Sequence, residues 1–448
     1  MEDRNERVEV NAWRRMSTLS RHCLAQCESS PVLNLTSASA LDDSKLAISE
    51  PVVIGGMVLD IHATPATATH RGSTTPGKVH YVHGGVARNV AECMSKLGTK
   101  PFMISVTGVD MAGNLLLEYW KSAGLVTEGI RRCQDVGTPT VINMFDFNGE
   151  VVAGVASTEA IEIFLNPEWV QRFWCNICSS PAVMVDANLS PTTLLSSCQI
   201  AAEFGIPVWF EPVSVAKSRR LASIAKYVTF TSPNEDELVA MANSFSAGNV
   251  FTPIKRVDDA GRRLPIESLF RMLKPAIMLL LEKGVKIIIV TLGADGVFIC
   301  SKDGPGFIKE YLKNTKSNSS RRQLYEIVTL YCASDKFGDV VDFKSGVPHL
   351  FAVHFSVLPA SVVKLTGAGD CLVGGTLSSL CAGLNLMQSI AVGMAAAKTA
   401  VEGSTNVPSE FNLSIIAGHV NQSQHPWLKE LSLNSCPLTS LPLNAVFA

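Results

Sequence analysis

The stretch Val52-Val53-Ile54-Gly55-Gly56-Met57-Val58-Leu59-Asp60 decides how this chain is expected to fold. Its three β-branched residues form a short apolar run of the kind found in buried strands, and two glycines end that run. Asp60 then lies beyond the carboxyl end of the strand, which is where parallel α/β folds bind ligands. One carboxylate there can accept hydrogen bonds from two vicinal hydroxyls, although an ordinary turn aspartate is the alternative.

Similar apolar runs follow along the chain and alternate with longer stretches of helical patterning. The expected strands after the first are 102–106, 182–186, 208–210, 227–231 and 287–291. The expected helices include 86–97, 194–204, 235–243 and 370–383. This alternation is typical of parallel strands joined through helices. The sequence therefore predicts an α/β fold with a doubly wound, mainly parallel sheet flanked by helices.

Two turn-rich segments, about 60–82 and 138–156, interrupt the alternation. The second contains Asn148-Gly149, a strong signal for a hairpin turn. We expect these segments to form a small β-sheet lid over a ligand. The polar run 313–322 predicts a surface insertion at 302–358, because long surface loops add little closure cost. The folded domain is expected to span 51–420, with a tail of unassigned role at 421–448.

Residues 1–50 are polar and rich in serine, which predicts a flexible extension or a targeting segment. Arg15-Met16, five residues and then His22-Cys23 resemble in part a type 2 peroxisomal signal. Two of the four defining positions depart from that signal. We therefore expect a peroxisomal protein, with the cytoplasm as the alternative.

Composition excludes several classes of function. The 448 residues are 47% hydrophobic and 17% charged, with a formal net charge of -2 and no sustained Lys/Arg stripe, which argues against nucleic-acid and membrane partners. No apolar run reaches the ~18 residues of a membrane-spanning helix. The 12 cysteines have no framework spacing, and the Cys175/Cys178 pair has no second pair to complete a metal site. A small-molecule partner is expected.

The run Thr366-Gly367-Ala368-Gly369-Asp370 carries the strongest chemical signal. Small residues at the start of a helix leave backbone amides open to an anion, so Gly367, Ala368 and Gly369 are candidates for an anion hole. A carboxylate beside such a hole can accept the proton of an attacking hydroxyl during phosphoryl transfer. Asp370 is thus the candidate catalytic base. The alternative is a glycine-flanked helix start with an aspartate facing the dipole.

A second glycine-rich run, Gly84-Gly85-Val86-Ala87-Arg88-Asn89, precedes a predicted helix. The glycines allow the backbone to approach a ligand closely, and the Asn89 amide lies in the first helical turn, where it can face the same ligand. This arrangement suits a polyhydroxylated molecule. Gly84, Gly85 and Asn89 are therefore candidates for substrate binding.

Two further groups suggest a nucleotide site. Asn234 and Glu237 share one face at the start of a helix and could hold water on Mg²⁺, or Asn234 could simply cap that helix. Thr291, Gly293 and Gly296 follow a buried strand and could line a phosphate path, or merely turn a hairpin.

The order of these pieces resembles the PfkB family of carbohydrate kinases over about 51–408. The family's two signatures match 84–108 and 366–375, and its Asn-x-x-Glu motif matches Asn234 to Glu237. The resemblance implies a ribokinase-like fold, ATP with Mg²⁺ as cofactor, and dimerisation through the lid. It assigns the roles as follows: Asp370 as the base, Gly367, Ala368 and Gly369 as the anion hole, Asp60, Gly84, Gly85, Asn89 and Asn188 to substrate, Asn234, Thr291, Gly293, Gly296, Gly403 and Asn406 to ATP, and Glu237 with Asn234 to the metal.

Two departures from the family pattern bear on the monovalent cation and on the substrate. The family often has Asp-Thr before the residue matched by Thr366, and the Asp helps to form a monovalent-cation site, whereas this chain has Lys364-Leu365. We therefore hypothesise that the Lys364 ammonium occupies or removes the need for that cation. Ribokinase usually has Asn two residues before the sugar-binding Asp, where this chain has Val58, which disfavours free ribose.

The runs 55–63, 186–189 and 364–370 resemble the plant-type pseudouridine kinases of the family. This resemblance implies ATP-dependent phosphorylation of the 5'-hydroxyl of pseudouridine. The alternatives are another sugar or nucleoside acceptor, such as adenosine, inosine, ribose or a ketose, or a catalytically idle interaction protein. A dinucleotide-binding dehydrogenase is disfavoured because no GxGxxG follows the first strand.

Overall fold

The computed structural model describes residues 50–70, 72–146, 151–246, 248–257, 262–302, 319–331, 350–422 and 429–430. The predicted N-terminal extension with its targeting motif, the Asn148-Gly149 turn and most of the predicted tail lie outside these residues. Within them, no helix is both long enough and apolar enough to cross a bilayer.

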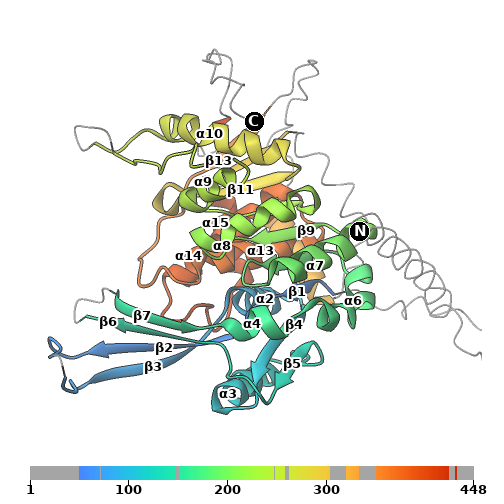
Figure 1. Cartoon of the computed structure of the whole chain (residues 1–448). Helices are drawn as coiled ribbons and strands as arrows, with labels where there is room; N and C mark the ends of the chain where they lie inside the picture. Colours follow the sequence, from blue (N-terminus) through green and yellow to red (C-terminus); the bar gives the residue numbers. More distant parts are fainter. Residues whose placement is uncertain are drawn as a thin grey trace, which may run out of the picture. The chain divides into compact units, whose positions relative to one another are not determined.

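A large twisted sheet forms the centre of the molecule (Figure 1). In the described residues its strand order is β14-β13-β12-β11-β10-β9-β8-β1-β4-β5. The strands are β1 (Val52–Ile54), β4 (Phe102–Gly108), β5 (Ile130–Cys133), β8 (Val183–Asp186), β9 (Val208–Glu211), β10 (Phe230–Thr231), β11 (Ile287–Thr291), β12 (Val297–Ser301), β13 (Phe351–Phe355) and β14 (Lys429–Glu430). Pairing is parallel from β5 to β11 and antiparallel from β11 to β14.

Both faces of this sheet are covered, as β1 illustrates. Val53 joins one hydrophobic cluster with residues of α2, α13 and α14, whereas Val52 and Ile54 join a second cluster with residues of α7, α9 and α10. Successive side chains of a strand point to opposite faces, so a strand buried on both sides is apolar throughout. The predicted doubly wound, mainly parallel sheet is therefore confirmed.

The helices begin and end close to the predicted positions. They are α2 (Val86–Lys96), α3 (Met111–Ser122), α4 (Glu159–Phe164), α5 (Pro167–Gln171), α6 (Trp174–Ser179), α7 (Pro191–Glu203), α8 (Val215–Ser218), α9 (Glu235–Asn243), α10 (Ile266–Glu282), α12 (Ser319–Tyr331), α13 (Ala368–Ala382), α14 (Leu386–Val401) and α15 (Leu413–Gln422). One predicted strand, 227–231, is shorter than expected. Only Phe230–Thr231 pair in the sheet, because Ala225–Tyr227 form a 3₁₀ turn.

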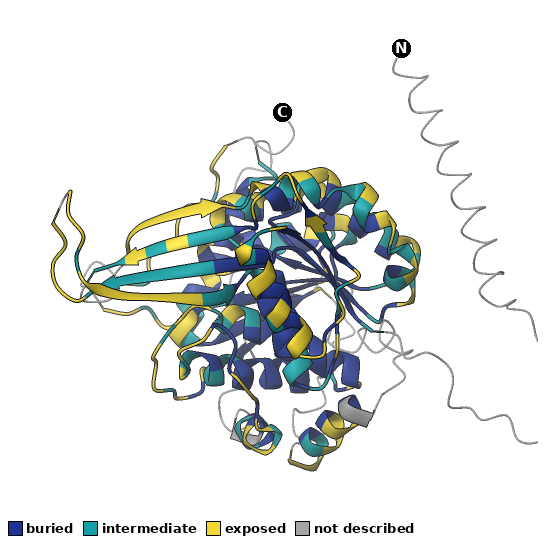
Figure 2. Cartoon of the chain, turned by 90° about the horizontal axis from the view of Figure 1, so that it is seen from below, coloured by how far each residue is buried: buried dark blue, intermediate teal, exposed yellow. Residues whose placement is uncertain are grey.

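A separate small sheet, here called the lid, projects from the central domain (Figures 1 and 2). Its strand order is β3-β2-β6-β7, with β2 at Val58–Pro65, β3 at Gly77–Gly84, β6 at Thr140–Phe145 and β7 at Val151–Ser157. The expected small sheet is therefore present, and it is built from the two segments that interrupt the α/β alternation.

The segment predicted as a surface insertion, 302–358, contains core elements. Leu324 and Val328 of α12 are fully buried, and β13 pairs with β12 in the central sheet. The polar run at 313–322 overlaps the start of α12, where Arg321 is buried and ion-paired with Glu50. Residues 303–318 and 332–349 lie outside the described part. The described parts of the predicted insertion, α12 and β13, therefore pack in the folded domain.

The strand order reverses beside β1. From β1 the chain runs through α2 to β4 on one side, and it later returns to β8 on the other side. Ligands of open α/β sheets bind where the strand order reverses in this way, beyond the carboxyl ends of the strands. The predicted site residues are expected to meet there.

Candidate active site

Asp370 lies in the first turn of α13. Gly367 caps this helix with a left-handed φ of 90°, and a Cβ there would lie 2.1 Å from the backbone oxygen of Asn406. Only glycine fits both conditions without strain. A Cβ on Gly369 would meet nothing within 4 Å, so the space above the helix start is open. The helix start therefore presents an exposed amide terminus suited to an anion.

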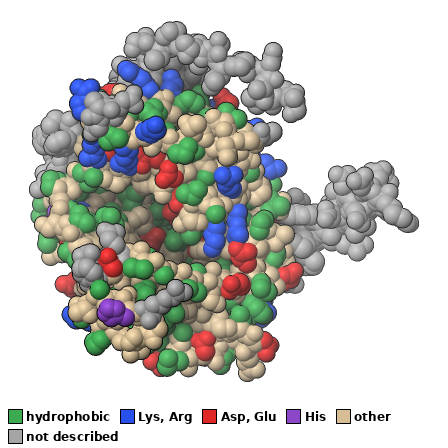
Figure 3. All heavy atoms as spheres, turned by 60° about the vertical axis from the view of Figure 1, so that its left-hand side comes forward, with side chains coloured by type: hydrophobic (Ala, Val, Ile, Leu, Met, Phe, Trp, Pro, Cys, Tyr) green, Lys and Arg blue, Asp and Glu red, His purple; other side chains and the backbone are tan. Residues whose placement is uncertain are grey.

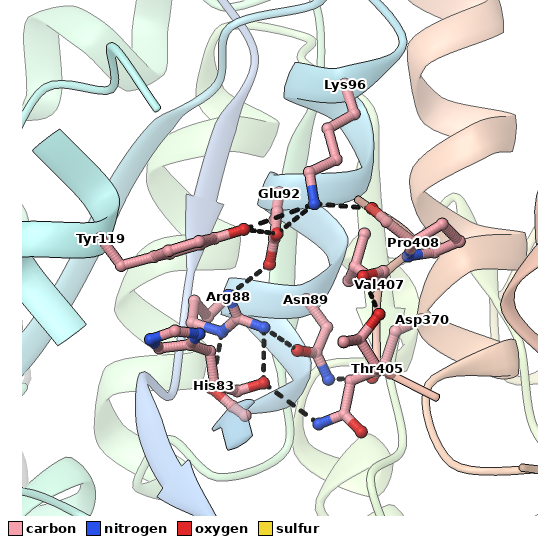
Figure 4. Close-up of polar contacts among 12 residues, drawn as sticks. His83, Arg88, Asn89, Glu92, Lys96, Tyr119, Asp370, Thr405, Val407 and Pro408 are labelled. Atoms are coloured by element: carbon pink, nitrogen blue, oxygen red, sulfur yellow. Dashed lines mark hydrogen bonds and ion pairs between the residues drawn. The ribbon is translucent and has the colours of Figure 1, made fainter. Parts of the chain in front are cut away.

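The Asn89 amide makes the direct contact with this carboxylate. Asn89 Nδ2 donates to Asp370 Oδ2 over 2.6 Å (Figure 4). Burial raises the pKa of Asp370 to about 7, and the Asp186 and Asp60 charges act in the same direction, while the Asn89 hydrogen bond and Arg88 oppose the shift. A carboxyl group with a pKa near the ambient pH is well matched to general base catalysis.

Asp186 occupies the carboxyl end of β8, and site prediction from sequence did not include it. Its carboxylate is fully buried and accepts hydrogen bonds from the backbone amides of Gly56 at 2.9 Å and Ala87 at 3.3 Å. A Cβ on Gly55 would lie 2.3 Å from Asp186 Oδ2, which explains the glycine there. Burial raises the pKa of Asp186 despite these hydrogen bonds. Its position at the end of a predicted strand, 182–186, is the sequence signal that could have identified Asp186 as a site residue.

Asp60 lies at the base of the lid, in β2. A Cβ on Gly84 would lie 2.1 Å from Asp60 Oδ2, and a Cβ on Gly85, whose φ is 94°, would lie 2.4 Å from the backbone oxygen of Gly56. Burial raises the pKa of Asp60, against the opposing effects of its Asn406 hydrogen bond, Arg88 and Lys364. Gly84 is therefore packed against Asp60, and Gly85 against the backbone of Gly56.

Asn406, predicted from sequence to bind ATP, lies beside Asp60. Its Nδ2 donates to Asp60 Oδ2 at 3.3 Å and to the backbone oxygen of His83 at 3.1 Å. Its Oδ1 accepts from Lys364 Nζ at 2.6 Å. Its amide therefore faces the substrate-side carboxylate. Gly403 follows α14 and donates its backbone amide to Ala400.

Asn188 is held by one backbone contact and one side-chain contact. It follows β8, its backbone amide donates to Asp186 Oδ1 at 2.9 Å, and its side-chain oxygen accepts from Lys217 Nζ at 2.7 Å. Lys217 was not predicted as a site residue. It comes from α8, and no motif in the sequence signals its approach.

Asn234 and Glu237 form a capping box at the start of α9. Asn234 Oδ1 accepts from the Glu237 amide, and Glu237 Oε2 accepts from the Asn234 amide, both at 2.9 Å. The capping alternative therefore describes the local geometry. Burial raises the pKa of Glu237. Among the described residues, no group of three or more His, Cys, Asp or Glu side chains is arranged to hold a metal ion directly.

Gly293 and Gly296 turn the hairpin between β11 and β12, as the alternative interpretation expected. Their φ angles are 58° and 90°, and a Cβ on Gly296 would lie 1.9 Å from the backbone oxygen of Phe355. Thr291 donates its backbone amide to Pro233 over 2.9 Å, which places the strand end beside the start of α9. The predicted nucleotide residues of these two elements are thus neighbours.

Glu211, at the carboxyl end of β9, is a second residue that sequence reasoning missed. It is buried and accepts a hydrogen bond from Ser232. Burial raises its pKa well above the usual value, and the charges of Asp370 and Glu237 raise it further. Val213 follows with a φ of 67°, a conformation that a β-branched residue rarely adopts. Figure 3 shows a hollow in one face of the molecule, with acidic side chains around it.

The sequence matches the family model described as pfkB family carbohydrate kinase over residues 50–316 and 344–409. The chain therefore belongs to the pfkB family of carbohydrate kinases. Together with the relatives below, this membership makes the protein an ATP-dependent phosphotransferase with an alcohol group as acceptor. The expectation of kinase activity from the sequence is confirmed.

The chain is 52% identical over 369 residues to pseudouridine kinase from Arabidopsis thaliana, which covers 82% of this chain and 95% of that relative. It is 21% identical over 329 residues to pseudouridine kinase from Escherichia coli strain K12, covering 72% and 97% of the two chains. Arabidopsis thaliana ribokinase complexed with ribose and ATP superposes with a TM-score of 0.60 at 17% identity, covering 84% of this chain and 99% of that chain. The ribokinase-like fold is thus confirmed.

Proposed function

We propose that this protein phosphorylates the 5'-hydroxyl of pseudouridine, with ATP and Mg²⁺. The contact of Asn89 with Asp370 at the open start of α13 carries this proposal, because it places a carboxylate with a pKa of about 7 beside an anion site. The choice of pseudouridine is supported by the 52% identity to the Arabidopsis thaliana enzyme of that name.

Asp370 is the proposed base. The substrate 5'-oxygen forms a bond to the γ-phosphorus as the bond from that phosphorus to ADP breaks, and the hydroxyl proton passes to the Asp370 carboxylate. The backbone amides of Gly367, Ala368 and Gly369 stabilise the charge on the moving phosphoryl group. Since Asp370 stands at the amide terminus of α13, it can meet both reacting groups.

The ribosyl hydroxyls are assigned to Asp60 and Asn89, beneath the lid. The missing side chain of Gly84 leaves room for the Asp60 carboxylate and that of Gly85 for the Gly56 backbone, and Asn188 is assigned to the same substrate group. Asn406 supports this group, because its amide donates to Asp60, and its predicted contact with ATP is kept as part of the proposal. Closure of the lid would exclude water as a competing acceptor.

The nucleotide is assigned to Thr291, Gly293, Gly296 and Gly403, with the metal near Asn234 and Glu237. The capping box uses Glu237 Oε2, which leaves the second carboxylate oxygen of Glu237 to hold a water of the ion. Mg²⁺ usually keeps several of its waters, so an indirect contact of this kind fits the residues present. The ion would neutralise charge on the ATP phosphates.

The lid is also the proposed dimer interface. Tyr81 pairs with Ile61, Ile61 with Ile142, and Ile142 with Val155, so that one face of the four strands is apolar. Tyr81, Ile142 and Val155 are exposed in the single chain. A continuous apolar surface of this kind marks an interaction site. Since the face has no charged residue along this row, a second copy of the same face suits it.

A substrate screen tests the proposed activity. Purified protein is assayed for ATP consumption with pseudouridine, uridine, adenosine, inosine, ribose and a ketose, and the product is identified by mass spectrometry. We expect the highest kcat/KM with pseudouridine. A higher value with another acceptor would reassign the substrate, and inactivity with all of them would favour an idle interaction protein.

The peroxisomal address stays a proposal based on Arg15-Met16 and His22-Cys23. Residues 1–50 fused ahead of a fluorescent protein would test it in living cells. We expect co-localisation with a peroxisomal marker, and loss of that pattern after Arg15→Ala. Diffuse fluorescence of the unaltered fusion would favour the cytoplasm.

A further inference from the structure

Helix α2 carries three charged side chains one turn apart, Arg88, Glu92 and Lys96, along a buried face (Figure 4). Arg88 is 2% exposed and Glu92 is 3% exposed. Charged groups are rarely buried to this extent unless they are paired and hydrogen-bonded. The helix begins directly after Gly85 and includes Asn89, so this ladder starts at the proposed catalytic contact.

Arg88 joins the lid to the Asn89 amide. Its Nε donates to the backbone oxygen of Gly84 at 2.9 Å, and its Nη2 donates to that of His83 at 2.7 Å. Both acceptors end lid strand β3. The same Nη2 also donates to Asn89 Oδ1. A guanidinium only donates, so Asn89 must turn its oxygen toward Arg88, which leaves its Nδ2 to donate to Asp370.

Glu92 holds the other side of the guanidinium. It accepts from Arg88 Nη1, from Lys96 Nζ and from the Tyr119 hydroxyl. Lys96 Nζ donates in addition to the backbone oxygen of Pro408 at 2.6 Å. Arg88 is therefore held by Glu92 on one side and by the end of β3 on the other, and Glu92 is itself fixed by Lys96 and Tyr119, outside the substrate site.

We propose that Arg88 is a positioning residue for phosphoryl transfer, which fixes the Asn89 amide in the orientation that donates to Asp370 and couples that orientation to lid strand β3. The inference rests on the proposed function. Without Arg88, the amide can rotate and present its oxygen to the carboxylate, and the base then loses the hydrogen bond that aims it. Arg88 touches no reacting atom in this scheme.

Arg88→Met and Arg88→Lys test the proposal. We expect Arg88→Met to lower kcat about 10- to 100-fold, because small misplacements of a catalytic group have effects of this size. KM for ATP, whose proposed site does not include Asn89, should change less than about threefold, a split that general loss of structure does not give. Arg322→Met is the matched control, since Arg322 also pairs with a glutamate four residues on but is exposed on α12. Its kcat should equal that of wild type.

The charge on Arg88 gives a second readout. Among the described residues, the charged and polar groups that interact with Asp370 are Arg88 and Asn89 of α2, Asp186 of β8, Asp60 of β2 and Glu211 of β9. Removing the arginine charge should move the acidic limb of the pH profile of kcat/KM to higher pH in Arg88→Met. Arg88→Lys keeps the positive charge but lacks the planar guanidinium with its several donors. We therefore expect a lower kcat in this variant, with the acidic limb of the pH profile unchanged.

Two further measurements keep the test decisive. The double variant Arg88→Met/Glu92→Met replaces the buried pair by apolar groups, a change that folded proteins often tolerate. If Arg88→Met does not fold, kcat is measured in the double variant instead. If neither folds, kcat is measured in Arg88→Lys. A folded variant with kcat within twofold of wild type would overturn the proposal.

Titration of the Asp370 carboxyl by carbon-13 NMR needs no turnover. It therefore separates failure of this inference from failure of the proposed function. If wild type phosphorylates none of the acceptors, the proposed function fails. An Asp370 pKa that is the same in wild type and Arg88→Met would count against the role of Arg88 in either case.

Discussion

Asn234 and Glu237 each accept a hydrogen bond from the other's backbone amide, at 2.9 Å in both directions. The same reciprocal contact starts α14, where Asn385 pairs with Gln388 at 2.9 and 3.2 Å. A glutamine thus serves this cap as well as a glutamate does. The cap and the proposed metal role of Glu237 can therefore be separated by one substitution.

Glu237→Gln is expected to leave stability within about 0.5 kcal/mol of wild type, because a surviving cap contributes as before. It should raise the Mg²⁺ concentration needed for half-maximal activity, because the negative charge near the ion is lost. Urea unfolding and Mg²⁺ titration of the rate measure the two effects. Asn234→Ala is the comparison, with an expected stability loss of about 1 kcal/mol. An unchanged Mg²⁺ requirement in Glu237→Gln would remove Glu237 from the metal site.

Asp370→Asn should lower kcat by about 10²–10⁴-fold, because it removes the proposed general base. Substrate binding by calorimetry should stay within a few-fold of wild type, since Asn is nearly the same size. Retained turnover would contradict the assignment of the base. In wild type, kcat/KM should rise with pH through about 7, the pKa of Asp370, because only the carboxylate accepts a proton.

The same variant should be more stable than wild type at pH 8. The pKa of an unfolded aspartate is about 3.9 and that of folded Asp370 is about 7, so between these values the folded state holds a proton that the unfolded state does not. The free energy of unfolding of wild type therefore falls as pH rises from about 4 to 7. Thermal unfolding should show the difference in Tm between Asp370→Asn and wild type growing from pH 5 to pH 8. A constant difference would mean that Asp370 is not desolvated.

Lys364 is expected to make the enzyme insensitive to potassium. Its ammonium donates to Asn406 at 2.6 Å, and burial lowers its pKa while Asp60 opposes that shift. Initial rates in potassium chloride and in choline chloride of equal ionic strength should agree within about twofold. The reason is that the Lys364 ammonium already supplies the positive charge that a bound potassium ion would supply. Lys364→Met should lower the rate in choline chloride. A steep rise of the wild-type rate with potassium would refute this hypothesis.

Val155→Glu should convert a dimer into a monomer. The side chain is 69% exposed at the edge of the apolar lid face, and two such charges would meet across a two-fold interface. Light scattering after size-exclusion chromatography gives the mass. Leu330→Glu on α12 is the control, because that leucine is exposed away from the lid strands, and its mass should match wild type. A monomeric wild type would exclude this interface.

The strands and helices near the site could be predicted because their local signals are strong. The apolar run 52–54 and the glycines after it give β1 and its turn, and small residues before Asp370 give the start of α13. By contrast, β13 was assigned to an insertion. Its five residues pair with β12, a partner about 50 residues earlier that no local pattern specifies.

The proposed substrate residues were predicted better than the residues that hold them in place. Asp60, Gly85 and Asn89 follow strands or begin helices, and their positions depend on sequence neighbours. Lys217 reaches Asn188, 29 residues away, and Asn406 reaches Asp60, 346 residues away. Contacts of this kind depend on how separate elements pack, which periodicity cannot reveal. The contact of Asn406 with Asp60 was consequently not predicted, and its role toward ATP stays a prediction.

The two-sided burial of β1 has a consequence for how the fold is specified. A strand with one solvent-exposed face is held in register by its alternating polar and apolar side chains, since a shift of one residue would expose the apolar ones. Val52, Val53 and Ile54 would be buried equally well after such a slip. What distinguishes the correct alignment is Asp186, whose Oδ2 accepts hydrogen bonds from the backbone amides of Gly56 and Ala87. Asp186 therefore belongs to the active site and also fixes the register of β1 against β8.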